Sequence, residues 1–383
     1  MAIPIVRTDF ELSSIYKSLK KSYSNEELSL AKVEDDFKIF TNKNYNIFFP
    51  KLRFGMEATF RSVFSNELIG VPTYTCSVVP HSVALSGNNI KFYDSNKHNL
   101  TTELYEKDLS SYIVTPWYGS PLDEDLLHSE NSFGDFSHLN ILDKKYTNNN
   151  FLATFYSFSS GKPISSIGGG LVSTNSKDLY LKVKSIRDSE FGEFLDKKVY
   201  FKNLFFSLGG YFFNSFYMES IKIYLDDNSY LDFLREPLNE ISLGGNQTSI
   251  DKYSLAMLKE RIIKYEMTKK NILEFWNEVF DNYSLKLLNG DDWSNSHLIL
   301  KIKDRDILKN KLRRIGIQSS YGANYLNHKL IPYKNINNVI NFPNATDHYE
   351  NILQLPINLS EISFSRLINK KTKINEILKS IYG

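Results

Sequence analysis

Short strand-like and helix-like segments alternate between residues 50 and 175, and this alternation limits the possible folds more than any other feature. The runs ELIGVP (67–72), IKFYD (90–94) and SSYIVTPW (110–117) are predicted to be buried strands. SVVPHSVALSG (77–87) is predicted to be a helix that ends at its glycine. Strands and helices that alternate with short connections indicate an α/β fold built on a mostly parallel sheet.

The second half of the chain has a different pattern. Residues 250–280 carry apolar side chains at helical spacing, over a length sufficient to connect two domains. Residues 297–317 predict a strand, a charged helix and a glycine stop, and 353–360 predict one more short strand. We therefore expect a large α/β domain over residues 1–248 and a smaller C-terminal α+β domain over 249–383.

Charge and composition exclude several classes of function. The 46 basic and 44 acidic residues nearly cancel, so nothing favours a nucleic-acid or anionic-membrane partner. The single cysteine, Cys76, excludes a disulfide framework, and the seven histidines show no metal-binding spacing. Acidic residues near the N-terminus replace the apolar stretch of an export signal, and no apolar window is long enough to span a membrane. These features predict a soluble, cytoplasmic protein.

Lys162 lies on a loop rich in serine and glycine, between the predicted strands 151–158 and 169–174. Most loop lysines are simply solvated. In α/β folds, however, ligand sites lie on loops at the carboxyl ends of strands, and a desolvated lysine there can form the Schiff base that pyridoxal phosphate (PLP) requires. From the chemistry alone, both interpretations stay open. The glycines at 168–170 lack the spacing of a phosphate-binding loop, so we expect close backbone packing at a strand start.

The order of these segments resembles the DegT-type sugar aminotransferases, fold type I PLP enzymes that act on nucleotide-linked keto-sugars. Residues 67–94 are similar to the family's valine-proline, aromatic-threonine, helix and strand segment, and 115–123 resemble its glycine-x-proline-x-aspartate turn. Residues 153–175 are similar to its lysine block, while 244–251 and 355–360 follow in the expected order. The resemblance covers most of the chain. It implies a large, mostly parallel PLP-binding α/β domain and a smaller C-terminal α+β domain.

Carried over position by position, the resemblance implies roles for four residues. Lys162 would form the Schiff base with PLP, and Ser157 would bind the phosphate of the cofactor. Gly55 would open the helix whose N-terminal N–H groups meet that phosphate. Asn246 would reach the phosphate of the neighbouring subunit in a homodimer.

The sequence departs from the family pattern around the expected cofactor. The family's acidic residue, normally aspartate, bonds the pyridine nitrogen and makes the ring an electron sink. Glu130 is our first candidate for this role, 32 residues before Lys162 (162 − 130), and Asp135 is the second. At the helix start, Met56 and Glu57 replace small hydroxyl residues, and an inward Glu57 would repel a phosphate.

A further departure concerns the ring that many family members stack on PLP. Cys76 stands at that position, with Tyr74 nearby. Phe133 is our candidate to supply the aromatic contact instead.

The resemblance implies transamination of a nucleotide-linked keto-sugar for surface polysaccharide or lipopolysaccharide synthesis, with glutamate as the amino donor. Two alternatives stay open. A sugar dehydratase is disfavoured because the dehydratases of this family lack the lysine that is kept here as Lys162. A catalytically degenerate relative would keep the fold to bind a sugar nucleotide or a partner enzyme, and Met56, Glu57 and the missing aspartate support it.

Overall fold

The structure is a computed structural model, and the residues that it describes are 3, 5, 11–23, 29–102, 109, 111–129, 131–159, 162–191, 197–214, 251–263, 269–290, 293–294, 296–323, 325–336, 341–357, 359 and 361–383. Two of the residues predicted to bind the cofactor, Glu130 and Asn246, lie outside these ranges.

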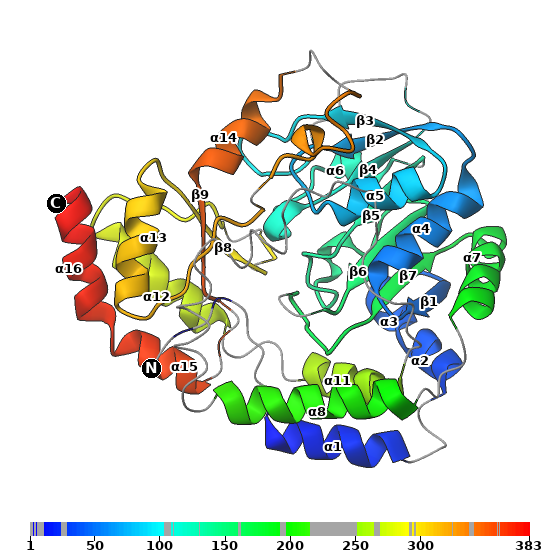
Figure 1. Cartoon of the computed structure of the whole chain (residues 1–383), viewed down its shortest axis with the longest axis horizontal. Helices are drawn as coiled ribbons and strands as arrows, with labels where there is room; N and C mark the ends of the chain where they lie inside the picture. The colour runs from blue at the N-terminus through cyan, green and yellow to red at the C-terminus, as the bar shows by residue number, and fades with distance from the viewer. Residues whose placement is uncertain are drawn as a thin grey trace.

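A seven-stranded sheet forms the centre of the larger part of the molecule (Figure 1). Its strands are, in spatial order, β1 (Tyr45–Phe49), β7 (Gly170–Thr174), β6 (Ala153–Ser157), β5 (Ser132–Asp135), β4 (Ser111–Val114), β2 (Leu68–Pro72) and β3 (Asn89–Tyr93). All neighbouring strands are parallel except β7, which is antiparallel to both β1 and β6. The predicted α/β fold with a mostly parallel sheet is confirmed, as is the pairing of the two strands that flank the Lys162 loop.

Helices cover both faces of this sheet because its strands are apolar on both sides. In β1, for example, Ile47 and Phe49 belong to one buried cluster and Phe48 belongs to the other. The first face is covered by α4 (Leu52–Val63), α5 (Val78–Leu85) and α7 (Lys177–Glu190). The second face is covered by α2 (Leu30–Asp36), the short α6 (Glu124–Leu127) and α11 (Lys252–Ile263). The short elements α3 (Lys38–Thr41), η1 (Trp117–Gly119) and η2 (Lys144–Tyr146) lie within connections.

The C-terminal part has its own buried cluster around a second, two-stranded sheet, as the sequence predicted for 297–317 and 353–360. Strands β8 (Leu298–Lys301) and β9 (Ile352–Leu355) pair antiparallel. Around them pack α12 (Lys269–Asp281), α13 (Arg305–Arg314), α15 (Glu361–Ile368) and α16 (Lys371–Tyr382) (Figure 1). The division into domains at residues 248 and 249 stays a prediction.

Two helix contacts join this part to the large sheet. The carboxylate of Asp94, just after β3, accepts hydrogen bonds from the first N–H groups of α14 (Pro343–Asn351), at Asn344 (3.0 Å) and Ala345 (2.7 Å). The side-chain amide of Asn327, in η3 (Asn327–Lys329), donates to the carbonyl groups of Thr73 and Thr75 after β2. The loop that follows β2 is therefore held by the C-terminal half of the chain.

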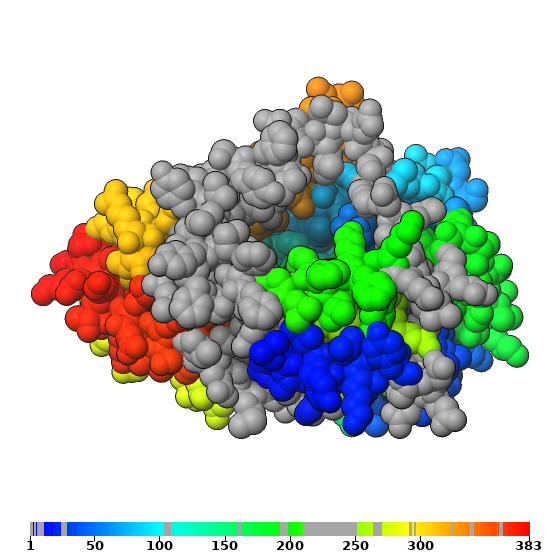
Figure 2. Space-filling view, turned by 60° about the horizontal axis from the view of Figure 1, so that its bottom comes forward, coloured from blue at the N-terminus to red at the C-terminus, as the bar shows by residue number. Residues whose placement is uncertain are grey.

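Three helices form a further layer beside the second face of the sheet. Helix α1 (Leu12–Tyr23) packs against α11, and α8 (Lys197–Asn214) packs against both, as Figures 1 and 2 show at the surface of the molecule. The predicted helix over 250–280 contains two helices, α11 and α12, with residues 264–268 between them outside the described part. Among the residues described, no helix has both the length and the hydropathy needed to cross a bilayer.

Lys43, just before β1, is a buried charge that lowers the stability of the fold. Its side chain is 3% exposed, and its amine donates to the carbonyl of Asn149 at 2.8 Å. Burial lowers the pKa of Lys43 to about 8. This value lies below the ordinary lysine pKa. The buried charge therefore lowers the free energy of unfolding by its full amount below about pH 8, and this loss of stability disappears as the pH rises towards about 10.5.

We therefore expect Lys43→Met to raise the free energy of unfolding by about 1–2 kcal/mol near neutral pH, after allowance for the lost hydrogen bond. The gain should shrink as the pH rises from about 8 to about 10.5. Urea unfolding at a series of pH values measures both effects. The exposed Lys32→Met, on α2, is the control and should change the free energy by less than about 0.5 kcal/mol. An equal destabilisation by Lys43→Met at every pH would contradict the argument.

Candidate active site

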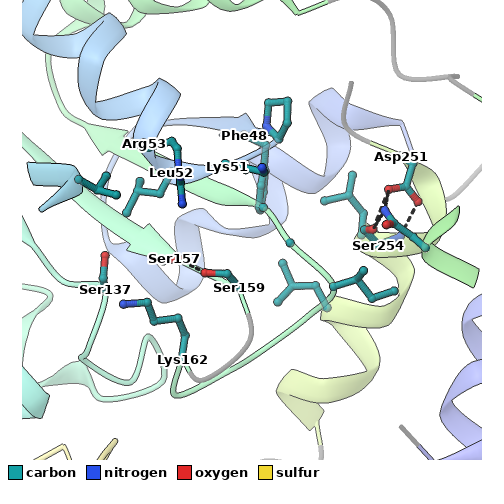
Figure 3. Close-up of a pocket in the computed structure, with 18 of the residues that line it drawn as sticks. Phe48, Lys51, Leu52, Arg53, Ser137, Ser157, Ser159, Lys162, Asp251 and Ser254 are labelled. Atoms are coloured by element: carbon teal, nitrogen blue, oxygen red, sulfur yellow. Dashed lines mark hydrogen bonds between the residues drawn. The ribbon is translucent and has the colours of Figure 1, made fainter. Parts of the chain in front are cut away.

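A cavity of about 840 Å³ lies at the carboxyl ends of the parallel strands. Its floor and walls come from the ends of β5 and β6, the start of α4 and the loop after β2, and α8 and α11 border it. Figure 3 shows Lys162 entering the cavity from the side opposite to Lys51, Leu52 and Arg53. Ligand sites of α/β folds lie at this edge of the sheet, and the volume is in the upper part of the usual range of roughly 300–1,000 Å³.

The N-terminus of α4 opens onto the cavity because glycine residues allow it to lie against β7. A Cβ atom on Gly170 would be 2.2 Å from the Cα of Leu52, so only glycine fits there. Gly169 has φ +106° and donates its N–H to the carbonyl of Pro50 at 3.0 Å. The predicted close backbone packing at a strand start is confirmed at Gly170, where β7 begins, while Gly169 is required for its positive φ. The first N–H groups of α4, which an α-helix leaves without intrahelical partners, therefore face a site suited to an anion.

Lys162 is a lysine of the cavity and not a solvated loop residue. It is half-buried, it lines the cavity, and its backbone N–H donates to the carbonyl of Ser159 at 3.2 Å. Burial lowers the pKa of Lys162; the nearby Cys76 and Asp135 oppose this shift, and Arg53 adds to it. A lysine with a lowered pKa has a larger neutral fraction, which is the nucleophilic form of the amine.

Asp135, at the end of β5, is an acidic residue whose charge raises the pKa of Lys162. Its side chain is 3% exposed, and Oδ1 accepts hydrogen bonds from Ser137 N (3.2 Å) and Ser137 Oγ (2.6 Å). Within the described part of the chain Oδ2 has no hydrogen-bond partner, and Asp135 lines the cavity. Burial raises the pKa of Asp135, while Ser137 and the charge of Lys162 oppose the shift. One carboxylate oxygen is thus available to a cationic or N–H group in the cavity.

Hydroxyl groups and cations surround the start of α4. The hydroxyl groups of Ser157 and Ser159 are 2.8 Å apart, and both residues line the cavity (Figure 3). Burial lowers the pKa of Lys51, and the charges of Arg53 and Lys202 lower it further. Cations that repel one another across a cavity favour the binding of an anion there.

The three residues predicted to lie together at the helix start, Gly55, Met56 and Glu57, have three different environments in the structure. Gly55 does not open α4, which begins at Leu52; a Cβ on Gly55 would lie 2.7 Å from Val172 and 2.9 Å from Phe49, so the glycine serves helix–sheet packing. Met56 is buried and lines the cavity. Glu57 is not among the lining residues, and its carboxylate lies 3.6 Å from Arg61, so it does not oppose an anion in the cavity.

The predicted aromatic contact from Phe133 is wrong. Phe133 is fully buried on the first face of the sheet, where its ring packs against Phe60 and Phe155, because it lies in the middle of β5 and the cavity begins only at the end of that strand. Cys76 does line the cavity, as does Trp117, while Tyr74 is buried behind them.

A stack of three rings lies behind Lys162. The imidazole of His138 stacks on Trp117 (centroids 4.4 Å apart) and on His297 (4.6 Å). Burial lowers the pKa of His138 well below its ordinary value, and the charges of Lys162 and His297 add to the shift. Its Nδ1 accepts the N–H of Tyr118 at 3.0 Å, so the neutral ring carries its proton on Nε2.

Sequence reasoning missed several cavity residues: Lys51, Arg53, Trp117 and Lys202. The signal for Lys51 and Arg53 was the pair of cations directly after the apolar strand NIFFP (46–50). No local signal marks Lys202, which comes from a helix distant in sequence. The described part of the chain holds no group of three or more His, Cys, Asp or Glu residues able to bind a metal ion.

Comparisons with known proteins find no matching family model and no matching curated protein. Many solved structures match, and the three described here cover 97–98% of this chain. One is the Helicobacter pylori aminotransferase PseC, involved in the biosynthesis of pseudoaminic acid, with TM-score 0.71, 15% identity and coverage of 98% of this chain and 100% of that chain. NtdA from Bacillus subtilis, with bound cofactor PMP, gives TM-score 0.68, 13% identity and coverage of 97% and 83%.

A third match is the GDP-4-keto-6-deoxymannose-3-dehydratase ColD, in a substituted form with bound GDP-perosamine. It gives TM-score 0.70, 14% identity and coverage of 98% of this chain and 100% of that chain. At this level of identity the comparisons establish the fold. The chain has the fold of DegT-type sugar aminotransferases, as the resemblance in sequence implied.

Proposed function

We propose that this protein is a PLP-dependent sugar aminotransferase. The observation that carries the proposal is the convergence of the Lys162 amine and the Asp135 carboxylate on one cavity, beside the N-terminus of α4. These groups come from the ends of adjacent parallel strands, β5 and β6, and from the loop after β6. A Schiff-base lysine, a buried acid and an anion-binding helix terminus are what a PLP site requires.

The cavity residues fit the parts of PLP. Asp135 keeps Oδ2 available for the pyridine nitrogen, and its buried position strengthens a charge-assisted hydrogen bond there. The start of α4, Arg53 and the paired hydroxyl groups of Ser157 and Ser159 supply donors for the phosphate. Cys76 and Trp117 line the walls.

When bound, PLP supplies an electron sink and a carrier for the amino group. The residues of this chain bind, orient and move protons around it. Lys162 would hold the cofactor covalently and, once released, would carry the proton between the substrate carbon and the cofactor carbon. Its lowered pKa favours both tasks, because the free amine must accept a proton near neutral pH. Asp135 would hold the ring protonated, and Ser137 fixes the orientation of its carboxylate.

The finer assignment follows the same resemblance. We infer a nucleotide-linked keto-sugar as amino acceptor, glutamate as amino donor, and a homodimer in the cytoplasm that serves surface polysaccharide or lipopolysaccharide synthesis. Asn246 would then contact the neighbouring subunit. Glu130, the first candidate from the sequence for the ring nitrogen, now ranks behind Asp135. The volume of about 840 Å³ supports a substrate larger than the cofactor alone.

A catalytically degenerate relative is the second candidate. Its support was the presence of Met56 and Glu57 at the helix start, and this support weakens because Glu57 pairs with Arg61 away from the cavity. The degenerate alternative also gives the amine of Lys162 no role.

Cofactor uptake tests the proposal directly. Purified protein mixed with PLP should become yellow, and borohydride should remove the colour and fix the cofactor covalently. Glutamate should convert the bound cofactor to its amino form and release 2-oxoglutarate in equal amount. Protein that takes up no PLP overturns the proposal, and protein that takes up PLP without reacting with any amino donor supports the degenerate alternative.

Arg53 carries a separate prediction about the phosphate. Arg53→Met should weaken PLP binding by about 10- to 100-fold, because a charge-assisted contact to the phosphate is lost. Absorbance titration with PLP measures this. The matched control is Arg61→Met on the same helix, whose side chain lies near Glu57 and Glu190 and not in the cavity. Equal affinities of the two variants would remove Arg53 from the phosphate site.

A further inference from the structure

Helix α8 has two distinct faces at helical spacing. One face packs on α1 and α11 through Tyr200, Leu204 and Leu208. The other side lines the cavity with Val199, Lys202, Phe205 and Phe206, and Asn203 lies at the boundary, where it lines the cavity and also bonds to the start of α11. Figure 2 shows α8 lying along α1 at the border of a hollow in the surface.

Polar contacts fix the rotation of α8 about its axis. The amide of Asn203 donates to the carboxylate of Asp251 (2.7 Å) and to the hydroxyl of Ser254 (3.0 Å), both on the start of α11. The hydroxyl of Ser207 lies 2.6 Å from that of Tyr253. Asp251 also accepts from the N–H and hydroxyl of Ser254, so its carboxylate is occupied at the N-terminus of α11 (Figure 3). The cavity face of α8 is therefore held in place before any ligand binds.

Lys202 adds a third cation to the cavity lining, besides Lys51 and Arg53. The charge of Arg53 lowers the pKa of Lys162, and the charges of Arg53 and Lys202 both lower the pKa of Lys51. Lys202 is exposed, and the described residues include no ion-pair partner for it. The cofactor phosphate would use Arg53, so Lys51 and Lys202 remain for a second anionic group.

Two aromatic rings accompany this second group of cations. Phe205 is 70% exposed and Phe206 is 49% exposed, which is unusual for phenylalanine side chains at a cavity. Exposed rings beside lysine side chains are suited to a planar base joined to phosphate groups, because bases stack on rings while cations neutralise the phosphates.

We propose that Lys51 and Lys202 hold the diphosphate of a nucleotide-linked substrate, whose base lies against Phe205 and Phe206. This inference rests on the proposed function, since it places the sugar end of the same molecule towards Lys162. It assigns to α8 the recognition of the part of the substrate that does not react.

Calorimetric titration of the full-length protein with UDP, GDP, CDP and dTDP, and with pyrophosphate, tests the inference. At least one nucleoside diphosphate should bind more tightly than pyrophosphate. Lys202→Met and Lys51→Met should each weaken its binding about tenfold. Lys198→Met, on the same helix but outside the cavity lining, is the control and should bind as the unmodified protein does. Equal binding by Lys202→Met and Lys198→Met would overturn the inference.

The rings need a variant of their own. The double variant Phe205→Leu with Phe206→Leu should lose about tenfold in affinity for the nucleoside diphosphate and none for pyrophosphate. Unchanged nucleotide binding together with a changed molecular mass in solution would assign the rings to contact between copies of this chain, and would overturn their role in base binding.

The two proposals fail in different ways. Protein that takes up PLP on Lys162 but binds no nucleoside diphosphate more tightly than pyrophosphate overturns the subsite and leaves the proposed function standing. Protein that takes up no PLP, yet binds a nucleoside diphosphate in a manner dependent on Lys202, supports the subsite and overturns the aminotransferase. The cofactor absorbance of Lys202→Met should match that of the unmodified protein, because the inference places Lys202 at the diphosphate and not at the cofactor.

Discussion

Lys162→Ala is expected to abolish transamination, with a loss of at least about 10⁴-fold in kcat, because both the covalent attachment of PLP and the proton transfer depend on this amine. The protein should remain folded, since the side chain is half-buried on a cavity wall and does not belong to a buried apolar cluster. The variant should bind PLP only reversibly. Borohydride treatment followed by mass spectrometry should detect no covalent cofactor.

The control for this variant is Lys182→Ala, which removes an exposed lysine from α7, where it pairs with Asp178. It should keep full activity and covalent labelling. Added methylamine should restore part of the activity of Lys162→Ala, since a small amine can enter the space and carry the proton. Covalent cofactor at another lysine in the Lys162→Ala variant would refute the assignment.

Asp135→Asn is expected to lower kcat by about 10²- to 10³-fold, with a smaller effect on substrate affinity. The amide cannot keep the pyridine nitrogen protonated, so the electron sink weakens in the transition state. The hydrogen bonds from Ser137 to Oδ1 can persist in the variant, which preserves the local fold. Steady-state kinetics should show the loss in kcat, and the absorption band of bound PLP should shift.

Glu130→Gln provides the comparison, because Glu130 is the other candidate for the same task. We expect it to change activity by less than about threefold, because the proposal assigns the ring nitrogen to Asp135. A large loss in Glu130→Gln with little effect of Asp135→Asn would reverse the assignment. Equal and small effects would mean that neither acid contacts the ring nitrogen.

The sequence predicted the architecture well where the signal is local. The strands at 67–72, 90–94 and 110–117 and the helix at 77–87 are present within a few residues of their expected bounds. Apolar runs, a glycine stop and short connections act over neighbouring residues, so they can be recognised without knowledge of the packing.

The site was predicted less accurately than the fold, because a site depends on the direction of its side chains. Phe133 and Asp135 are two residues apart on β5, yet only Asp135 lines the cavity, because the strand ends there and its chain turns towards Ser137. Gly55 was assigned to a helix start that lies three residues earlier, at Leu52.

The sequence by itself determined the α/β alternation and the strand pair around Lys162, because these follow from interactions between near neighbours in the chain. Only the tertiary structure decided that Asp135 and Arg53 lie around Lys162 and that α8 brings Lys202 to the same cavity. Those positions depend on the pairing of β5 with β6, on the approach of α4 to β7, and on the packing of α8 against α11. Each is a contact between segments distant in sequence, which local patterns do not encode.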